Sequence, residues 1–190
     1  MPAEPLTAEP ACKIVVVGPP GSGKGAYVKA VAARYGQTPS REYRLAECTV
    51  VRADFLVPGP DAGDLRVTMH ALTGPHHYEA SDELLLRDAD GILFLCEPNQ
   101  AHIGRIREEL LCFTEQALRC GINFSRVPVA FQYQRVERIP GFDAHRADQV
   151  LGVPTDSVPR FSATSSQPDA SGQTFDAIMD RVRLVRGSDG

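Results

Sequence analysis

Residues 13–24 read Lys13-Ile14-Val15-Val16-Val17-Gly18-Pro19-Pro20-Gly21-Ser22-Gly23-Lys24. The run at its start is short, apolar and β-branched, which is typical of a strand buried on both faces in a parallel sheet. The second half matches the pattern GxxxxGK, and apolar residues at helical spacing follow it. The stretch therefore predicts a buried strand, a phosphate-binding loop and a helix, in that order.

The glycines of this loop let the backbone bend around a phosphate without a clash from a Cβ atom. Successive backbone N–H groups and the positive end of the helix dipole then face the anion, and Lys24 reaches the outer phosphates. Such a loop ordinarily continues with a Ser or Thr that binds Mg²⁺, but here Gly25 predicts weak metal binding and slow hydrolysis. We expect the phosphates to be held by Gly18, Gly21, Ser22, Gly23, Lys24, Gly25 and Ala26.

Strands and helices alternate along the rest of the chain. Further strands are predicted at 50–56, 65–72, 92–96, 127–133 and 160–163, and helices at 101–120, 143–151 and 175–182. This alternation is typical of an α/β, doubly wound domain with a mostly parallel sheet of about six strands flanked by helices. We expect the domain to span residues 13–186, between a mobile arm at 1–12 and a flexible tail at 187–190.

The composition places limits on function. A chain of 190 residues with 43% hydrophobic residues predicts one soluble domain, and its formal charge of -4 argues against nucleic-acid binding driven by net charge. No apolar run approaches the roughly 18 residues that cross a bilayer, so we expect no transmembrane segment. The five cysteines are scattered and never form CxxC, which argues against a disulfide framework or a structural zinc site. We therefore expect a reduced, cytoplasmic protein.

Two families share parts of this pattern. The loop from Gly18 to Gly25 resembles that of adenylate kinases, although that family has Thr at the position of Ala26. A second resemblance runs from Lys13 to about Val185 and is to the MglA type of bacterial Ras-like small GTPases, which control cell polarity and motility. It rests on separate segments in that family's order: Asp54-Phe55-Leu56 and residues 74–78, 80–81, 86–94, 128–133 and 172–175.

The MglA-type resemblance carries expectations about fold, ligand and partner. It implies a Ras-like G domain, which is a three-layer fold with a phosphate loop and a mostly parallel sheet. It implies GTP or GDP as the bound nucleotide, with Mg²⁺ held weakly in this chain. It also implies a protein partner, a Roadblock-type (MglB-like) homodimer that docks on the switch regions.

The residues that would read the base depart from that family's Asn-Lys-x-Asp, because this chain has Gln134-Arg135-Val136-Glu137. Glu137 would accept the hydrogen bonds of guanine through one extra methylene, and Arg135 would stack over the base. Ser162-Ala163-Thr164 resembles the family's Ser-Ala loop, whose alanine N–H meets the guanine carbonyl. We expect the base to be held, with relaxed selectivity, by Gln134, Arg135, Glu137, Ser162, Ala163 and Thr164.

The switch regions depart as well. Gly74 keeps the position that contacts the γ-phosphate, but the glutamine that orients water is replaced by Pro75, which offers neither a side-chain donor nor a backbone N–H. Two residues are candidates for rebuilt catalysis: His76 beside this position, and Arg52 as an internal arginine finger. Thr49 is the candidate metal ligand of the first switch.

The first hypothesis is a switch protein that binds a guanine nucleotide, hydrolyses it poorly and acts through a protein partner. Three alternatives remain open beside it. They are a small GTPase whose hydrolysis is rebuilt by unusual residues, a nucleotide kinase of the adenylate kinase type, and a pseudo-GTPase that binds no nucleotide. The nucleotide released on denaturing the protein separates guanine binders, adenine binders and a protein that binds neither.

Overall fold

The computed structural model describes residues 12–37, 41–45, 48–59, 63–73, 79–99, 101–154, 156–166 and 170–188. The strands are β1 (Cys12–Val17), β2 (Arg41–Leu45), β3 (Cys48–Val57), β4 (Leu65–Thr73), β5 (Gly91–Cys96), β6 (Val129–Tyr133) and β7 (Arg160–Ser162). The helices are α1 (Lys24–Arg34), α2 (Glu79–Leu86), α3 (Ile103–Arg119), a short 3₁₀ turn η1 (Val136–Arg138), α4 (Ala144–Leu151) and α5 (Ala170–Ser188).

The strands form a seven-stranded sheet in the order β2-β3-β4-β1-β5-β6-β7. Strand β1 lies in the middle and pairs in parallel with β4 and β5, and β6 and β7 continue the parallel half. Strands β2, β3 and β4 pair antiparallel. The predicted α/β architecture with a mostly parallel sheet is confirmed. We expected about six strands, and β2 at the edge is the additional one.

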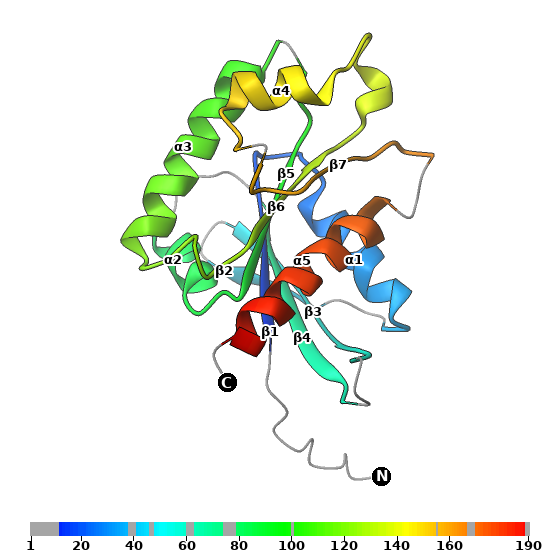
Figure 1. Ribbon diagram of the computed structural model, residues 1–190, viewed down its shortest axis with the longest axis vertical. Helices are drawn as coiled ribbons and strands as arrows, with labels where there is room; N and C mark the ends of the chain where they lie inside the picture. The colour runs from blue at the N-terminus through cyan, green and yellow to red at the C-terminus, as the bar shows by residue number, and fades with distance from the viewer. Residues whose placement is uncertain are drawn as a thin grey trace.

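Helices cover both faces of the sheet (Figure 1). On one face α1 and α5 bury Val28, Val31, Phe175 and Ile178 against the strands, and β1 supplies Ile14 at the centre of this layer. On the other face α2, α3 and α4 pack over a second apolar layer. Because β5 is buried along its whole length, its sequence GILFLC is apolar on both faces, as a central parallel strand requires.

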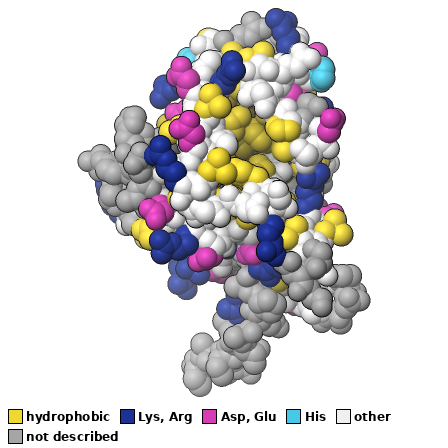
Figure 2. Space-filling model, turned by 60° about the vertical axis from the view of Figure 1, so that its left-hand side comes forward, with side chains coloured by type: hydrophobic (Ala, Val, Ile, Leu, Met, Phe, Trp, Pro, Cys, Tyr) yellow, Lys and Arg dark blue, Asp and Glu magenta, His cyan; other side chains and the backbone are white. Residues whose placement is uncertain are grey.

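The ends of the expected domain can be placed only in part. The expected arm at 1–12 lies outside the described residues except for Cys12, which is buried in β1. Residues 187 and 188 of the expected tail form the last positions of α5, and 189–190 lie outside the described residues. Within the described parts of the chain, no helix is both long and apolar enough to cross a membrane. On the face that Figure 2 shows, basic and acidic side chains alternate around a central apolar area.

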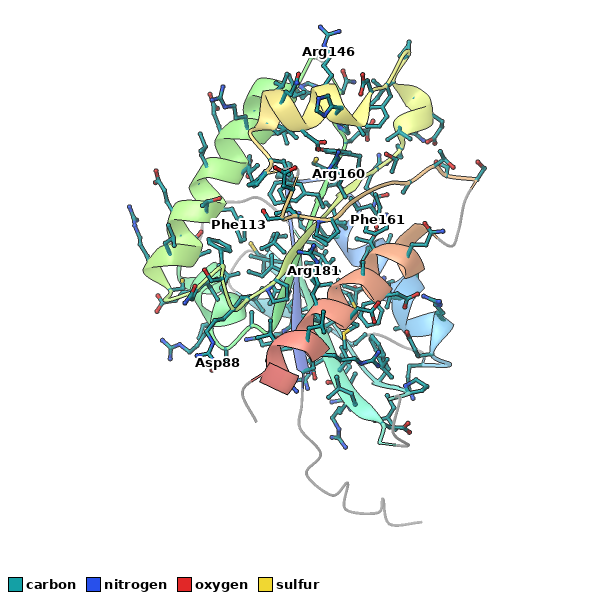
Figure 3. All side chains as sticks on the ribbon, viewed as in Figure 1. Asp88, Phe113, Arg146, Arg160, Phe161 and Arg181 are labelled. Atoms are coloured by element: carbon teal, nitrogen blue, oxygen red, sulfur yellow. The ribbon has the colours of Figure 1, made fainter. Side chains whose placement is uncertain are left out.

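A buried carboxylate joins β6, α4 and β7. Asp148 on α4 is fully buried, and its Oδ1 accepts a hydrogen bond of 2.5 Å from the Tyr133 hydroxyl. Its Oδ2 lies 2.5 Å from Nε of Arg160, which is labelled in Figure 3 below α4. Burial, followed by the hydrogen bond to Asp148, raises the pKa of Tyr133 above its ordinary value. The carboxylate therefore fixes the short helix α4 on the edge of the sheet that carries β7.

His70 on β4 makes stability depend on pH. Burial, together with the charges of Lys13 and Arg52, lowers the pKa of His70 from 6.5 to about 4. As pH falls below 6.5, His70 becomes protonated in the unfolded chain, but in the folded chain it becomes protonated only near pH 4. The free energy of unfolding therefore declines between pH 6.5 and about 4. We expect His70→Gln to flatten this decline, measured as urea midpoints at pH 7 and pH 5. An equal decline in both proteins would contradict the assignment.

Candidate nucleotide-binding site

The candidate site lies where β1, β5, β6 and β7 end. Because these strands are parallel, their carboxyl ends meet at one edge of the sheet, which is where open α/β sheets bind ligands. The phosphate loop follows β1, Glu97 follows β5, residues 134–137 follow β6, and residues 163–166 follow β7. The structure therefore brings the predicted phosphate loop and the predicted base-reading segments together.

Backbone geometry explains the glycines of the phosphate loop. A Cβ atom at Gly18 would lie 1.9 Å from the Leu95 carbonyl oxygen, so no other residue fits beside β5 at this point. Gly23 precedes α1 with a φ of +88°, in the left-handed region that favours glycine. No described side chain caps α1, and its first turn carries no acidic residue. The amides of Gly25 and Ala26 thus begin a helix whose positive end suits a phosphate.

Lys24 is held inside the loop. Its side chain is buried, and Nζ donates hydrogen bonds of 2.6 Å to the Gly18 carbonyl and 2.9 Å to the Pro19 carbonyl. Because the ammonium group is bonded to the loop that would surround the phosphates, its charge is placed where the outer phosphates are expected. The contact of Lys24 with the outer phosphates, which the GxxxxGK pattern implies, stays a prediction.

Arg135 joins the segment after β6 to the phosphate loop. Its Nη2 donates a hydrogen bond of 2.8 Å to the Gly21 carbonyl, and its Nη1 lies 3.1 Å from Oε2 of Glu97. The residue adopts a φ of +53°, which directs the chain into η1. The arginine thus lies between the two predicted subsites. Glu97, which balances its charge, was absent from the residues that we expected at the site.

Glu137 is oriented by a residue that the sequence did not single out. Its Oε1 accepts hydrogen bonds of 3.2 Å from the Ser165 backbone N–H and 2.6 Å from the Ser165 hydroxyl. The hydrogen bond from the Ser165 hydroxyl lowers the pKa of Glu137, so the carboxylate is ionised at neutral pH. The run of small polar residues from 162 to 166 was the available signal for Ser165.

The remaining base-reading candidates occupy the ends of β6 and β7. The Gln134 backbone N–H donates to the Cys96 carbonyl at 2.7 Å. Ser162 belongs to β7, opposite Tyr133, and the Ala163 N–H donates to the Tyr133 carbonyl at 2.7 Å. The Ala163 N–H that we expected to meet a guanine carbonyl is therefore used within the sheet. The loop proper begins at Thr164, whose hydroxyl lies 3.1 Å from that of Ser166.

Among the described residues, the expected metal position offers few ligands. A Cβ atom at Gly25 would lie 3.2 Å from Cγ2 of Val51 and 3.5 Å from Cγ2 of Thr73, so methyl groups surround it. Thr49 lies opposite Thr73 in the sheet, and its backbone carbonyl accepts a hydrogen bond of 3.0 Å from the Thr73 hydroxyl. Ala71, three residues before Gly74, is fully buried and carries no ligand atom in its side chain. The described side chains around Gly25 therefore fit Mg²⁺ poorly.

Of the two catalytic candidates, only Arg52 lies within the described residues, and its guanidinium is paired with Asp54. Arg52 lies opposite His70 in the sheet, three positions after Thr49 along β3. Its Nε and Nη2 donate three hydrogen bonds of 2.8 to 3.2 Å to the Asp54 carboxylate. His76 and Gly74 lie outside the described residues. Binding and catalysis by the candidate residues stay predictions.

The described residues contain no group of three or more His, Cys, Asp or Glu side chains arranged to hold a metal ion. Taken together, the sheet order, the loop after β1 and the helices on both faces define the fold of a Ras-like G domain. One solved structure with this fold is the small GTPase Arl6 (BBS3) from Trypanosoma brucei with the bound nucleotide analogue GppNp.

The alignment with the Arl6 structure has a TM-score of 0.65 and covers 92% of this chain and 99% of that chain. The aligned residues are 14% identical, a level at which the likeness shows the fold alone. No protein-family model matches the sequence, and no curated protein matches it.

Proposed function

We propose that this chain is a switch protein of the small GTPase type, which holds a guanine nucleotide and hydrolyses it slowly. The observation that carries the proposal is the convergence of three segments at one edge of the sheet. Lys24 lies in the phosphate loop, Arg135 bonds to that loop from the segment after β6, and Glu137 is held by Ser165 from the segment after β7. The fold match to a small GTPase solved with a nucleotide analogue supports the same function.

In this proposal the phosphates lie against the loop amides and Lys24, and the base lies between Arg135 and the residues after β7. Glu137 uses Oε1 for Ser165, which leaves Oε2 to accept from the Watson–Crick edge of guanine. We assign the contact with the guanine carbonyl to Ser166 rather than to Ala163 or Ser165, because the Ala163 N–H already serves the sheet and the Ser165 N–H and hydroxyl already donate to Glu137.

Slow hydrolysis follows from three missing contributions. Gly25 has no hydroxyl for Mg²⁺, and Pro75 cannot orient a water molecule. The guanidinium of Arg52 is engaged by Asp54, so it does not supply the charge that an arginine finger would bring to the transferring phosphoryl group. The chain keeps the loop that would bind phosphates, and the contributions of Gly25, Pro75 and Arg52 to their transfer are missing.

A protein that binds a nucleotide and hydrolyses it slowly acts through the partner protein that recognises the nucleotide-bound form. We propose the MglA-type role for this chain, in cell polarity or motility, with a Roadblock-type homodimer as the partner. The support is the order of the sequence segments that resemble that family. Mixing the chain with such a homodimer and measuring the mass of the complex tests this part; two separate species would exclude the partner.

The weak metal site leads to a prediction about EDTA. We expect EDTA to change the nucleotide affinity of the natural protein very little, because Gly25 and Ala71 provide no ligand. Gly25→Ser together with Val51→Ala should make the affinity depend on Mg²⁺, since the smaller residue 51 leaves room for the serine. Val51→Ala alone is the control for lost packing. Complete loss of nucleotide from the natural protein on adding EDTA would contradict this prediction.

The test of the proposed function is the identity of the nucleotide released on denaturing freshly purified protein, followed by titrations with GTP and ATP. We expect guanine nucleotide and a preference for GTP that Glu137→Gln reduces, because the amide presents a donor where guanine needs an acceptor. Glu108→Gln on the exposed surface of α3 is the matched control. Released adenine would favour the kinase alternative, and absence of any nucleotide would favour a pseudo-GTPase.

A further inference from the structure

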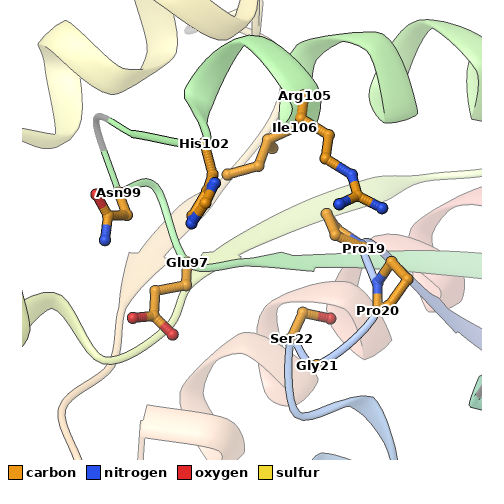
Figure 4. Close-up of a pocket in the computed structure, with 9 residues that line it drawn as sticks. All are labelled: Pro19, Pro20, Gly21, Ser22, Glu97, Asn99, His102, Arg105 and Ile106. Carbon is orange, nitrogen blue, oxygen red and sulfur yellow. The ribbon is translucent and has the colours of Figure 1, made fainter.

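Helix α3 carries two leucines on the side that faces away from the sheet. Leu111 is 55% exposed and Leu118 is 58% exposed, whereas Ile106 and Ala117 on the inner side of the helix are buried. Figure 1 shows α3 along the left-hand side of the molecule, with no described helix on its outer side. At the start of the helix, Arg105 and Ile106 line the pocket beside the phosphate loop (Figure 4). The two leucines lie on the other side and face solvent.

Five residues form one stripe along this outer side of α3. Since successive residues of a helix are turned by about 100°, the other four lie within about 40° of Leu111 around the helix axis. From the start of the helix the stripe consists of Gly104, Arg107, Leu111, Glu115 and Leu118, and all five are exposed. We call these residues the α3 stripe.

The spacing of the α3 stripe is symmetric about Leu111. Arg107 and Glu115 stand four residues before and after it, and Gly104 and Leu118 stand seven residues before and after it. A two-fold axis at Leu111 that places a second copy of α3 antiparallel to the first therefore brings these positions together in pairs. Leu111 meets itself, Arg107 lies at the height of Glu115 of the second copy, and Gly104 lies at the height of Leu118 of the second copy.

The residues paired in this way are complementary. Neither Arg107 nor Glu115 has an ion-pair partner among the residues that the structure describes, so their opposite charges are available for a second copy. A Cβ atom at Gly104 would meet no described atom within 4 Å, so this position offers open space for a leucine side chain. At the centre, two exposed leucines lose contact with water when they pack against each other.

We propose that the α3 stripe is the contact surface of a symmetric dimer, in which α3 of one copy packs antiparallel on α3 of a second copy. The leucines supply the apolar contact, and two ion pairs between Arg107 and Glu115 fix the register and the direction of the helices. One pair of helices buries less surface than a standard protein interface, so the dimer is weak and forms at micromolar or higher concentration. The dimer does not depend on the proposed nucleotide function, because the α3 stripe contains no residue of the candidate nucleotide site.

The test is sedimentation equilibrium of the full chain at concentrations from about 5 to about 500 µM. A reductant is present, because Cys112 is exposed and would otherwise allow dimers linked by a disulfide. We expect the mass to rise with concentration from 20.6 kDa towards twice that value. A mass of 20.6 kDa at every concentration would overturn the proposal.

A substitution at the centre of the stripe locates the contact. Leu111→Glu places two carboxylates next to each other on the two-fold axis and should raise the dissociation constant at least about tenfold. Leu184→Glu makes the same change on α5, where the leucine is 74% exposed, and should dimerise as the natural protein does. Dimerisation of Leu111→Glu with the affinity of the natural protein would mean that another surface makes the contact, which refutes the proposal.

An exchange of charges tests the antiparallel register. Arg107→Glu alone and Glu115→Arg alone each bring like charges together across the axis, so each should weaken the dimer about tenfold. The double variant restores opposite charges between the two copies and should regain most of the lost affinity. Residues 107 and 115 lie about 12 Å apart along one helix, so the exchange creates no new pair within a chain. Thermal unfolding establishes that each variant is folded, and a double variant as weak as the single ones would overturn the proposal.

Discussion

Lys24→Met will lower nucleotide affinity by at least about tenfold, or 1.4 kcal/mol. The substitution keeps the length of the side chain and removes the ammonium group that bonds to the carbonyls of Gly18 and Pro19. Two losses then add: the outer phosphates lose an opposite charge, and the loop loses the bonds that hold it in shape. Calorimetric titration with GTP measures the change.

The control for this substitution is Lys29→Met. Lys29 lies on the same helix, is exposed, and pairs with Glu42 at 2.5 Å rather than with the loop. We expect this variant to bind nucleotide as the natural protein does. Thermal unfolding of both variants establishes that they are folded. Equal GTP affinity in Lys24→Met and the natural protein would remove the basis for the phosphate-loop assignment.

Asp148→Ala will reduce the free energy of unfolding by about 3 kcal/mol. The carboxylate is fully buried and satisfies both the Tyr133 hydroxyl and the Arg160 guanidinium. Its removal leaves a buried hydroxyl without an acceptor and takes the Asp148 ion pair from Arg160, and the cost of the unsatisfied hydroxyl adds to the loss of the original contacts. Urea unfolding of the natural and variant proteins gives the difference.

Two further variants bracket the effect of Asp148→Ala. Asp143 caps the same helix from the exposed side, where its Oδ1 accepts from the His145 amide at 2.9 Å, so Asp143→Ala should cost about 1 kcal/mol. Tyr133→Phe removes one donor and keeps the pair with Arg160, so its cost should also be smaller. The interpretation fails if Asp148→Ala is no more destabilising than Asp143→Ala.

The central part of the fold could be predicted because its signals are local. The run from Ile14 to Val17 is apolar at every position, and the glycines of the loop after it mark the turn into a helix. Strand β2 carries no such signal. Its sequence REYRL is mostly charged and exposed, and it forms a strand only because β3 offers an edge to pair with.

The candidate site shows the same division between local and long-range information. The sequence predicted a role for Glu137, but the contact with Ser165 joins residues 28 positions apart and depends on how far β7 extends beside β6. Because the parallel pairing of β6 and β7 reaches Ser162, the next backbone N–H, that of Ala163, donates to the Tyr133 carbonyl within the sheet. The pair of Arg52 with Asp54 could have been predicted, because residues two apart in a strand share a face.

The left-handed backbone of Arg135 links the free energy of folding to the entropy cost of binding a ligand. A residue other than glycine at a φ of +53° costs about 1 kcal/mol or more in folding free energy. This cost falls on the residue whose guanidinium donates a hydrogen bond to the Gly21 carbonyl and so connects the segment after β6 to the phosphate loop. Two loops that are already hydrogen-bonded to each other lose less conformational entropy when a ligand binds. Part of the entropy cost of binding is therefore already included in the free energy of folding. A glycine at this position would relax the backbone and leave that cost to the ligand.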